Sequence, residues 1–176
     1  MPPVRVAAVQ LEARIADVAE NLARCERLAD EAGAQGAELI VLPEFFTTGM
    51  AFREELADAA LPPDGAATDL MAALARRHDA TVGGSFICRD ADGENRNAFL
   101  LVTSDGVVGR HDKDIPTMWE NAFYIGGTDD GVIPWAPRWC RRWPGRSERR
   151  SSTPPTAVRS RARRCVPDGR GRTRSR

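Results

Sequence analysis

Residues 37–46 read AELIVLPEFF, and this stretch decides the fold. Its centre, from Leu39 to Leu42, is a short continuous apolar run, which is typical of a strand buried on both faces of a sheet. Such strands occur mainly in α/β proteins, where helices cover a parallel sheet. Pro43 and Glu44 follow the run directly. The stretch therefore predicts an α/β fold with the Glu44 carboxylate at the carboxyl edge of the sheet, where α/β proteins place their sites.

The residues before this stretch complete a strand–helix–strand unit. Residues 4–11 (VRVAAVQL) contain small and β-branched side chains without Gly or Pro, which predicts a strand. Asp17 is a candidate N-cap, and apolar residues at helical spacing follow it up to Ala32. Gly33 and Gly36 mark the end of this helix. A strand, a helix and a buried strand in this order predict a parallel pair.

The chain after Glu44 continues with alternating elements. Residues 51–65 are expected to form an excursion with a short acidic helix, and residues 110–127 an irregular connection. Gly83 and Gly84 within the next strand indicate a close approach of another segment. Between these regions the pattern predicts a helix with one apolar face (Leu70, Met71, Leu74, Ala75) and strands at 81–87, 98–102 and 107–108, joined by turns at 92–93 and 104–106.

Two residues stand out as candidates for chemistry. The apolar neighbours of Glu44 are expected to desolvate its carboxylate and suit it to a general base. Lys113 is the only lysine in the chain, beside 24 arginines. Because Lys and Arg differ in shape, hydration and acidity, a single retained lysine suggests that an ammonium group is needed there. Position alone leaves the plain alternatives open: a surface or capping glutamate, and a lysine retained by chance on a loop.

Three segments together resemble the nitrilase, or carbon–nitrogen hydrolase, superfamily. They are VAAVQ at 6–10, AELIVLPEFF at 37–46 and RHDKDIPTMWE at 110–120, and the resemblance runs from about residue 4 to about residue 135. It implies a four-layer α-β-β-α sandwich and hydrolysis of a small amide or nitrile to an acid and ammonia or an amine. It also implies homo-oligomers in the intact family and chemistry by a Cys-Glu-Lys triad, without a metal or an organic cofactor.

The resemblance assigns roles residue by residue. Glu44 would be the general base that takes the thiol proton and later activates water. Lys113 would stabilise the tetrahedral intermediate formed when the thiolate attacks. Glu120, seven residues after the lysine, matches a second glutamate that holds the lysine or the substrate, with an ordinary loop salt bridge as the alternative.

Three aromatic residues of the same region, Trp119, Phe123 and Tyr124, bear on the substrate. They could line a pocket for an apolar acyl group, or they could be ordinary core residues. The sequence leaves this choice open, and with it the identity of the substrate.

The third member of the triad has no clear counterpart. The family's cysteine ends a strand a few dozen residues after the lysine. Cys140 lies 27 residues after Lys113 without an apolar run before it, and Cys165 is further away. Neighbouring arginines would lower a thiol pKa, but a reactive thiolate still needs a positioned base. We therefore expect this chain to be an incomplete and inactive hydrolase, with an active amidase or nitrilase that uses Cys140 as the alternative.

The charge of the chain divides into two unlike parts. Residues 1–136 contain 11 basic and 23 acidic side chains, whereas residues 137–176 contain 14 arginines against Glu148 and Asp168, so net charges of −12 and +12 cancel. Residues 137–176 contain no Leu, Ile, Phe, Met or Tyr and show no periodicity. The prediction is a partial hydrolase domain at 1–136, followed by a tail that is disordered or comes from a non-native reading frame.

Other classes of function are less well supported. The overall charge of zero argues against a nucleic-acid binder driven by bulk charge. The arginine-rich tail leaves a nucleic-acid-binding module as an alternative, although it has no repeat and no RGG pattern. Four scattered cysteines, no signal-peptide pattern and no apolar stretch long enough for a membrane span predict a cytoplasmic protein with reduced thiols. Half of a sandwich would leave one sheet face bare, so low stability or aggregation is expected.

Overall fold

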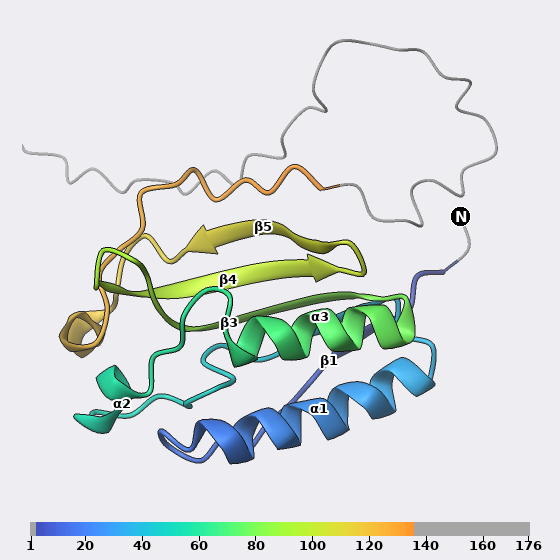
Figure 1. Ribbon diagram of the computed structural model, residues 1–176, viewed down its shortest axis with the longest axis horizontal. Coiled ribbons are helices and arrows are strands. Elements are labelled where there is room, and N and C mark those ends of the chain that lie inside the picture. The colour runs from blue at the N-terminus through green and yellow to red at the C-terminus, as the bar shows by residue number, and fades with distance from the viewer. Residues whose placement is uncertain (1–2, 136–176) are drawn as a thin grey trace, which may run out of the picture.

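The computed structural model describes residues 3–135 (Figure 1). The tail predicted at 137–176, with Cys140 and Cys165, lies outside the described residues. The elements, in chain order, are β1 (Val6–Ala8), α1 (Val18–Ala34), β2 (Leu39–Val41), α2 (Glu55–Asp58), α3 (Ala66–His78), β3 (Thr81–Arg89), β4 (Asn95–Thr103), β5 (Gly106–Asp112) and the 3₁₀-helix η1 (Met118–Ala122).

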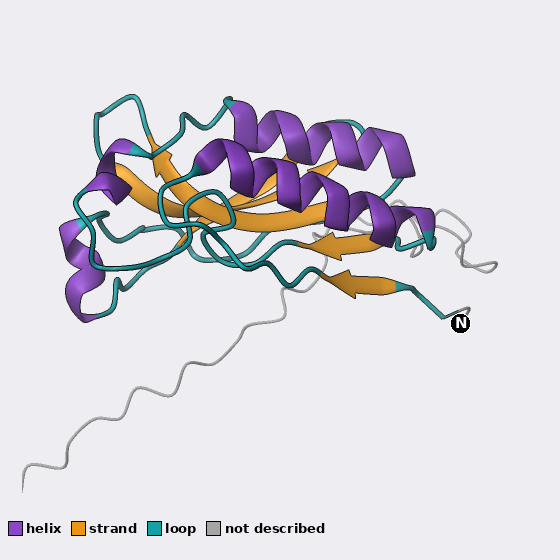
Figure 2. Cartoon of the chain, turned by 90° about the horizontal axis from the view of Figure 1, so that it is seen from below, coloured by secondary structure: helices purple, strands orange, loops and turns teal. Residues whose placement is uncertain are grey.

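The strands form one sheet in the order β1-β2-β3-β4-β5. β1 and β3 are both parallel to β2, whereas β3, β4 and β5 form an antiparallel meander. Helices α1 and α3 lie side by side on one face of this sheet (Figures 1 and 2). The predicted α/β class and the parallel first pair are confirmed, and the described residues supply one sheet and one helix layer of the predicted sandwich.

The two long helices form where the sequence pattern predicts them. The side chain of Asp17 accepts a hydrogen bond from the Glu20 N–H at 3.2 Å and caps the start of α1. The buried residues of each helix lie on one face: Asn21, Cys25 and Ala29 on α1, and Ala67, Met71, Leu74 and Ala75 on α3. A contact between His78 Nε2 and Asp30 Oδ1 at 2.7 Å links the two helices. Within residues 3–135, no helix is both long and apolar enough to span a bilayer.

The glycine pair of β3 allows two neighbouring segments to pack closely. A Cβ atom on Gly84 would lie 2.9 Å from Leu42 Cβ and 3.2 Å from the Phe46 ring. One on Gly83 would lie 2.9 Å from the Phe99 ring. The predicted close approach is confirmed, and it brings the segment that follows β2 directly onto β3.

The prediction of irregular structure for 110–127 is wrong at the start of the region and in its middle. β5 continues through Arg110 and His111 to Asp112, because His111 pairs with Phe99, and Asp112 with Ala98, in the ladder with β4. Further on, Met118–Ala122 form the 3₁₀-helix η1. Three consecutive polar residues carry no strand signal of their own, so pairing with β4 decides their conformation.

On the face of the sheet opposite α1 and α3, several apolar side chains are covered by no helix among residues 3–135. Val6 is 57% exposed, and Leu39, Val41 and Phe99 are partly exposed. At the β5 end, Ile133 packs against Gly109, where a Cβ atom would lie within 2.2 Å of it. The sheet therefore has apolar residues on both faces, as expected for a layer that is covered on both sides.

The α3 contact with the sheet gives a first prediction. Leu74 is completely buried, so Leu74→Ala should lower the free energy of unfolding by about 2–5 kcal/mol through lost burial and a cavity. The neighbouring exposed residue provides the control, because Arg76→Ala should change it by less than about 0.5 kcal/mol. Urea unfolding followed by circular dichroism measures both, and equal effects of the two variants would contradict this packing.

Candidate active site

Glu44 is presented by a tight turn at the end of β2. The Leu42 N–H donates to Gly83 O at 2.7 Å and the Phe46 N–H donates to Ser85 O at 3.2 Å, so β3 holds both sides of the turn. Phe45 adopts a left-handed conformation (φ 53°), which costs roughly 1–2 kcal/mol for a residue with a side chain. Strained backbone of this kind often occurs at functional sites.

The rings beside Glu44 turn away from it into the core. Phe45 is 3% exposed and packs against Tyr124 at a centroid distance of 5.9 Å, whereas Phe46 is completely buried against Phe86. The Glu44 side chain itself is 54% exposed. The predicted desolvation of Glu44 by its apolar neighbours is therefore wrong within the described residues, because the two phenylalanines pack into separate clusters on either side of the turn.

Asn97 of β4 connects Glu44 to Lys113. Its Nδ2 donates to Glu44 Oε1 at 2.8 Å, and its backbone carbonyl accepts from the Lys113 N–H at 3.0 Å. Asn97 is 3% exposed. Asn97 was not predicted from the sequence: it follows Asn95 and Arg96 and directly precedes the apolar run at 98–102, so it carries no distinguishing signal of its own.

Lys113 brings the two predicted glutamates together. Its Nζ lies 2.9 Å from Glu120 Oε2 and 3.4 Å from Glu44 Oε1, across 69 residues of sequence in the second case. All three predicted site residues thus meet at one ammonium group. From the sequence alone, each could also have been an ordinary surface, capping or salt-bridge residue. The distances show that the three form one cluster.

Glu120 is held by its own helix cap. It is 7% exposed and accepts hydrogen bonds from the Thr117 backbone N–H at 2.6 Å and from the Thr117 hydroxyl at 2.5 Å; the first of these belongs to a capping box at the start of η1. Burial alone would raise the pKa of Glu120, but the hydrogen bonds from Thr117 and Lys113 lower it to about 2. Glu120 is therefore a fixed anion beside Lys113.

The same contacts keep Lys113 charged. Burial alone would lower the pKa of Lys113, but the hydrogen bond to Glu120 raises it above its ordinary value, with further contributions from Tyr124 and Glu44. Burial, followed by the proximity of Glu120, raises the pKa of Tyr124 to about 12. Near neutral pH the cluster therefore contains a permanent cation and a neutral phenol.

A shallow cavity of about 370 Å³ opens beside this cluster, on the sheet face opposite the helices. Its lining combines apolar, amide, hydroxyl and charged groups: Leu42, Glu44, Ser85, Asn97, Phe99, His111, Lys113 and Asp114. Among residues 3–135 no group of three or more His, Cys, Asp or Glu is placed to hold a metal ion.

The three aromatic residues considered as a substrate pocket lie elsewhere. Phe123 and Tyr124 are buried in the smaller apolar cluster, and Trp119 packs edge-to-face against Phe52 and Phe123. The lining of the cavity includes none of the three. Within the described residues, Phe123 and Tyr124 therefore fit the description of core residues better than that of pocket-lining residues.

The two described cysteines do not supply a nucleophile. Cys25 and Cys88 are buried on the helix side of the sheet, away from the cavity lining, and burial raises the pKa of each to about 12. A thiol of that kind stays protonated at neutral pH and is inert.

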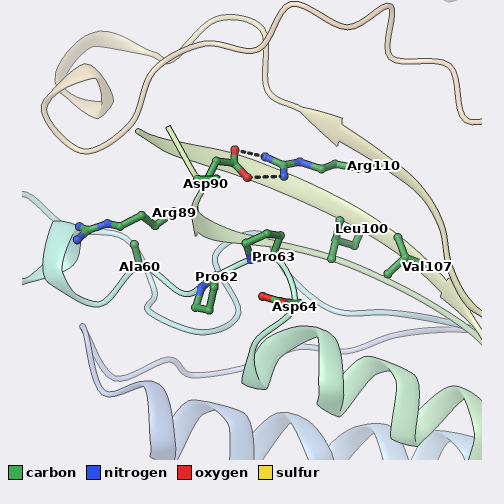
Figure 3. A pocket seen from close by; sticks show the side chains of 10 residues that line it. Ala60, Pro62, Pro63, Asp64, Arg89, Asp90, Leu100, Val107 and Arg110 are labelled. Atoms are coloured by element: carbon green, nitrogen blue, oxygen red, sulfur yellow. Dashed lines mark hydrogen bonds and ion pairs between the residues drawn. The ribbon is translucent and has the colours of Figure 1, made fainter. Parts of the chain in front are cut away.

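A second cavity, of about 750 Å³, lies on the helix side of β4 and β5 (Figure 3). Arg110 donates to both carboxylate oxygens of Asp90 at 2.7 and 2.6 Å, and Arg96 donates to Asp90 at 2.8 Å. Leu100 and Val107 form an apolar wall beside this network. These ion pairs tie the β3–β4 turn to β5, and every charged group named in them is paired, so this cavity has no counterpart of the Glu44–Lys113 arrangement.

Comparison with known proteins identifies the family of the chain. The sequence profile of the carbon-nitrogen hydrolase family matches residues 5–137. The chain belongs to this family. The match includes Glu44, Lys113 and Glu120 and confirms the resemblance inferred from the three sequence segments.

Individual relatives add detail. The chain is 33% identical over 131 residues to a protein named nitrilase from Pyrococcus abyssi, covering 73% of this chain and 49% of that protein. It is 36% identical over 121 residues to the omega-amidase YafV of Yersinia enterocolitica, covering 68% and 45%. A CN-hydrolase superfamily protein from Xanthomonas campestris, solved with an arsenic adduct in its active site, superimposes with a TM-score of 0.66 at 29% identity, covering 73% and 48%. The chain thus spans about half the length of these relatives.

The pairing of Lys113 with Glu120 gives a second prediction. Glu120→Gln should lower the pKa of Lys113, because burial then acts with one fewer anion to oppose it. Lys113 is the only lysine, so NMR of ¹³C-labelled lysine side chains gives one signal to titrate. The pH window follows from the sign of the shift. The folding stability that comes from the raised pKa of Lys113 is fully present below about pH 10. It is lost as the pH rises through the pKa of Lys113 in the folded state. In Glu120→Gln this loss should occur at a lower pH.

The exposed Glu31 on α1 provides the matched control. Glu31→Gln removes the same charge without touching the cluster, so it should leave the Lys113 titration unchanged. An equal shift in both variants would show that net charge, and not the contact with Glu120, sets the acidity of Lys113.

Proposed function

We propose that this domain carries the carboxylate and lysine machinery of a hydrolase that acts on the carbon–nitrogen bonds of small amides or nitriles. The observation that carries the proposal is the position of Lys113, whose ammonium group lies between the exposed Glu44 and the buried Glu120 beside a cavity. Family membership and relatives named nitrilase and omega-amidase support the reaction class.

The two glutamates differ in the way that the proposed roles require. Glu44 is half exposed and accepts one hydrogen bond from Asn97 and one from Lys113, so lone pairs remain for a thiol proton or a water. Glu120 is buried and held by Thr117 and Lys113. We assign Glu44 as general base and Glu120 as a positioning residue for Lys113.

Lys113 would stabilise the tetrahedral intermediate. When a thiolate attacks an amide carbonyl, the carbon–sulfur bond forms and negative charge moves to the oxygen. A fixed ammonium ion next to that oxygen lowers the barrier, because it needs no reorganisation as the charge develops. The proton that Glu44 takes from the thiol then goes to the leaving amine as the carbon–nitrogen bond breaks.

The nucleophile is the missing part of this proposal. Cys25 and Cys88 are buried away from the cavity, and Cys140 and Cys165 lie outside the described residues. We therefore propose that the chain as given does not turn over amides or nitriles by itself. An active hydrolase that uses Cys140 is the alternative.

A turnover assay separates these readings. The full chain, incubated with aliphatic amides and nitriles, should release no ammonia above the rate without protein. Cys140→Ala should behave in the same way. Ammonia release that disappears in Cys140→Ala would instead support the active enzyme.

An added thiol tests the machinery without the missing nucleophile. With ethanethiol present, the full chain should accelerate the release of 4-nitroaniline from 4-nitroacetanilide, because Glu44 can take the proton of the added thiol. Glu44→Gln should reduce the acceleration roughly a hundredfold, the lower end of the usual contribution of a general base. Lys113→Met should reduce it as well, whereas Glu31→Gln should have no effect. Equal rates with and without protein would contradict the proposed function.

A further inference from the structure

His111 lies on the same cavity as Glu44 and Lys113 and has no role in the proposed reaction so far. It is near the end of β5, two residues before Lys113, and its side chain is 32% exposed. Because alternate residues of an extended chain point to the same face, His111 and Lys113 project together from backbone positions about 6.7 Å apart. The sequence analysis did not single out this histidine.

Asp129 fixes the orientation of the His111 ring. Its Oδ1 lies 2.7 Å from His111 Nδ1, and its two oxygens also accept hydrogen bonds from the Gly131 N–H at 2.8 Å and the Asp112 N–H at 2.9 Å. Burial alone would raise the pKa of Asp129, but these hydrogen bonds lower it to about 2. An ionised carboxylate only accepts hydrogen bonds, so Nδ1 of the ring must carry a proton.

The other ring nitrogen is left for the cavity. A Cβ atom on Gly131, which has a φ of +66°, would lie 3.3 Å from Cε1, 3.5 Å from Nδ1 and 3.8 Å from Nε2 of the ring, so this glycine packs against the Cε1 edge. Nε2 has no hydrogen-bond partner among residues 3–135. In the neutral ring with a proton on Nδ1, Nε2 is a hydrogen-bond acceptor.

We propose that His111 is a specificity-determining residue that favours carboxamides over nitriles, its Nε2 accepting an N–H of the substrate while Lys113 contacts the carbonyl oxygen. This inference rests on the proposed function and assigns its substrate class. Two hydrogen bonds of about 2.9 Å, one to each side chain, suit the two ends of one planar amide group held between residues that project side by side.

A nitrile cannot make the same contact. Its nitrogen carries a lone pair and no hydrogen, so a nitrile next to Nε2 places two acceptors together and leaves both unpaired. An acceptor that the bound ligand removes from water and leaves without a donor weakens binding by roughly tenfold or more. The amide should therefore bind at least tenfold more tightly than the nitrile of the same carbon skeleton.

NMR of the full chain tests the proposal directly, because the chain contains only two histidines and one lysine. Butyramide and butyronitrile are titrated separately at pH 8 into protein with labelled histidine and lysine side chains. The Lys113 signal reports binding, and the imidazole nitrogens report the contact. Butyramide should shift Nε2 of His111 and leave His78 unchanged, and it should bind at least tenfold more tightly than butyronitrile.

Two variants separate a specific contact from a merely structural role. His111→Phe should lower the affinity for butyramide and raise that for butyronitrile until the two are similar, because no acceptor is then left unpaired, whereas a structural defect would weaken both equally. Lys113→Met should weaken the binding of butyramide, observed then at His111.

The outcomes distinguish this inference from the proposed function. Butyramide binding that moves Lys113 but not His111 Nε2, with the affinity ratio intact in His111→Phe, overturns the role of His111 and leaves the proposed function standing. Failure of both ligands to move Lys113 overturns the two together.

Discussion

One ammonium group, that of Lys113, determines the arrangement at the carboxyl edge of the sheet. Glu44 follows β2 and Glu120 lies in η1, and two carboxylates this close to a common centre would repel each other without a cation between them. The backbone of Lys113 is fixed by Asn97, and Glu120 is fixed by Thr117. Both contacts hold charged groups in place. The fold therefore fixes the positions of Lys113 and Glu120, which charge attraction alone would not do.

The main features of the fold follow from the sequence, because burial and periodicity act locally. The Asp17 cap, the apolar faces of α1 and α3 and the apolar run before Glu44 each depend on residues close in the chain. The end of β5 could not be predicted in the same way. Its polar residues form a strand because they pair with β4 by backbone hydrogen bonds, and that pairing is a property of the tertiary structure.

The candidate site could be predicted only in part, for the same reason. Glu44 was singled out by its place after a buried strand, Lys113 as the only lysine, and Glu120 by the family resemblance, and the structure brings the three together. Asn97, Thr117 and the pairing of His111 with Asp129 depend on strand register and on the path of the chain after η1, which spacing does not encode. The exposure of Glu44 depends on the left-handed turn at Phe45, which sends the neighbouring rings into the core. The conformational propensities of the residues do not predict such a turn.

Among residues 3–135, the sheet face opposite the helices has partly exposed apolar residues, as do sheets that pack against a further layer. The ion-paired Lys113 has a different kind of consequence, which concerns labelling in the laboratory. It is the only side-chain amine of the chain and is held in its charged form, whereas acylating reagents attack the free base. Amine-directed dyes and cross-linkers should therefore leave the side chains of this protein largely unmodified, and arginine- or carboxylate-directed reagents are the better choice for attaching a probe.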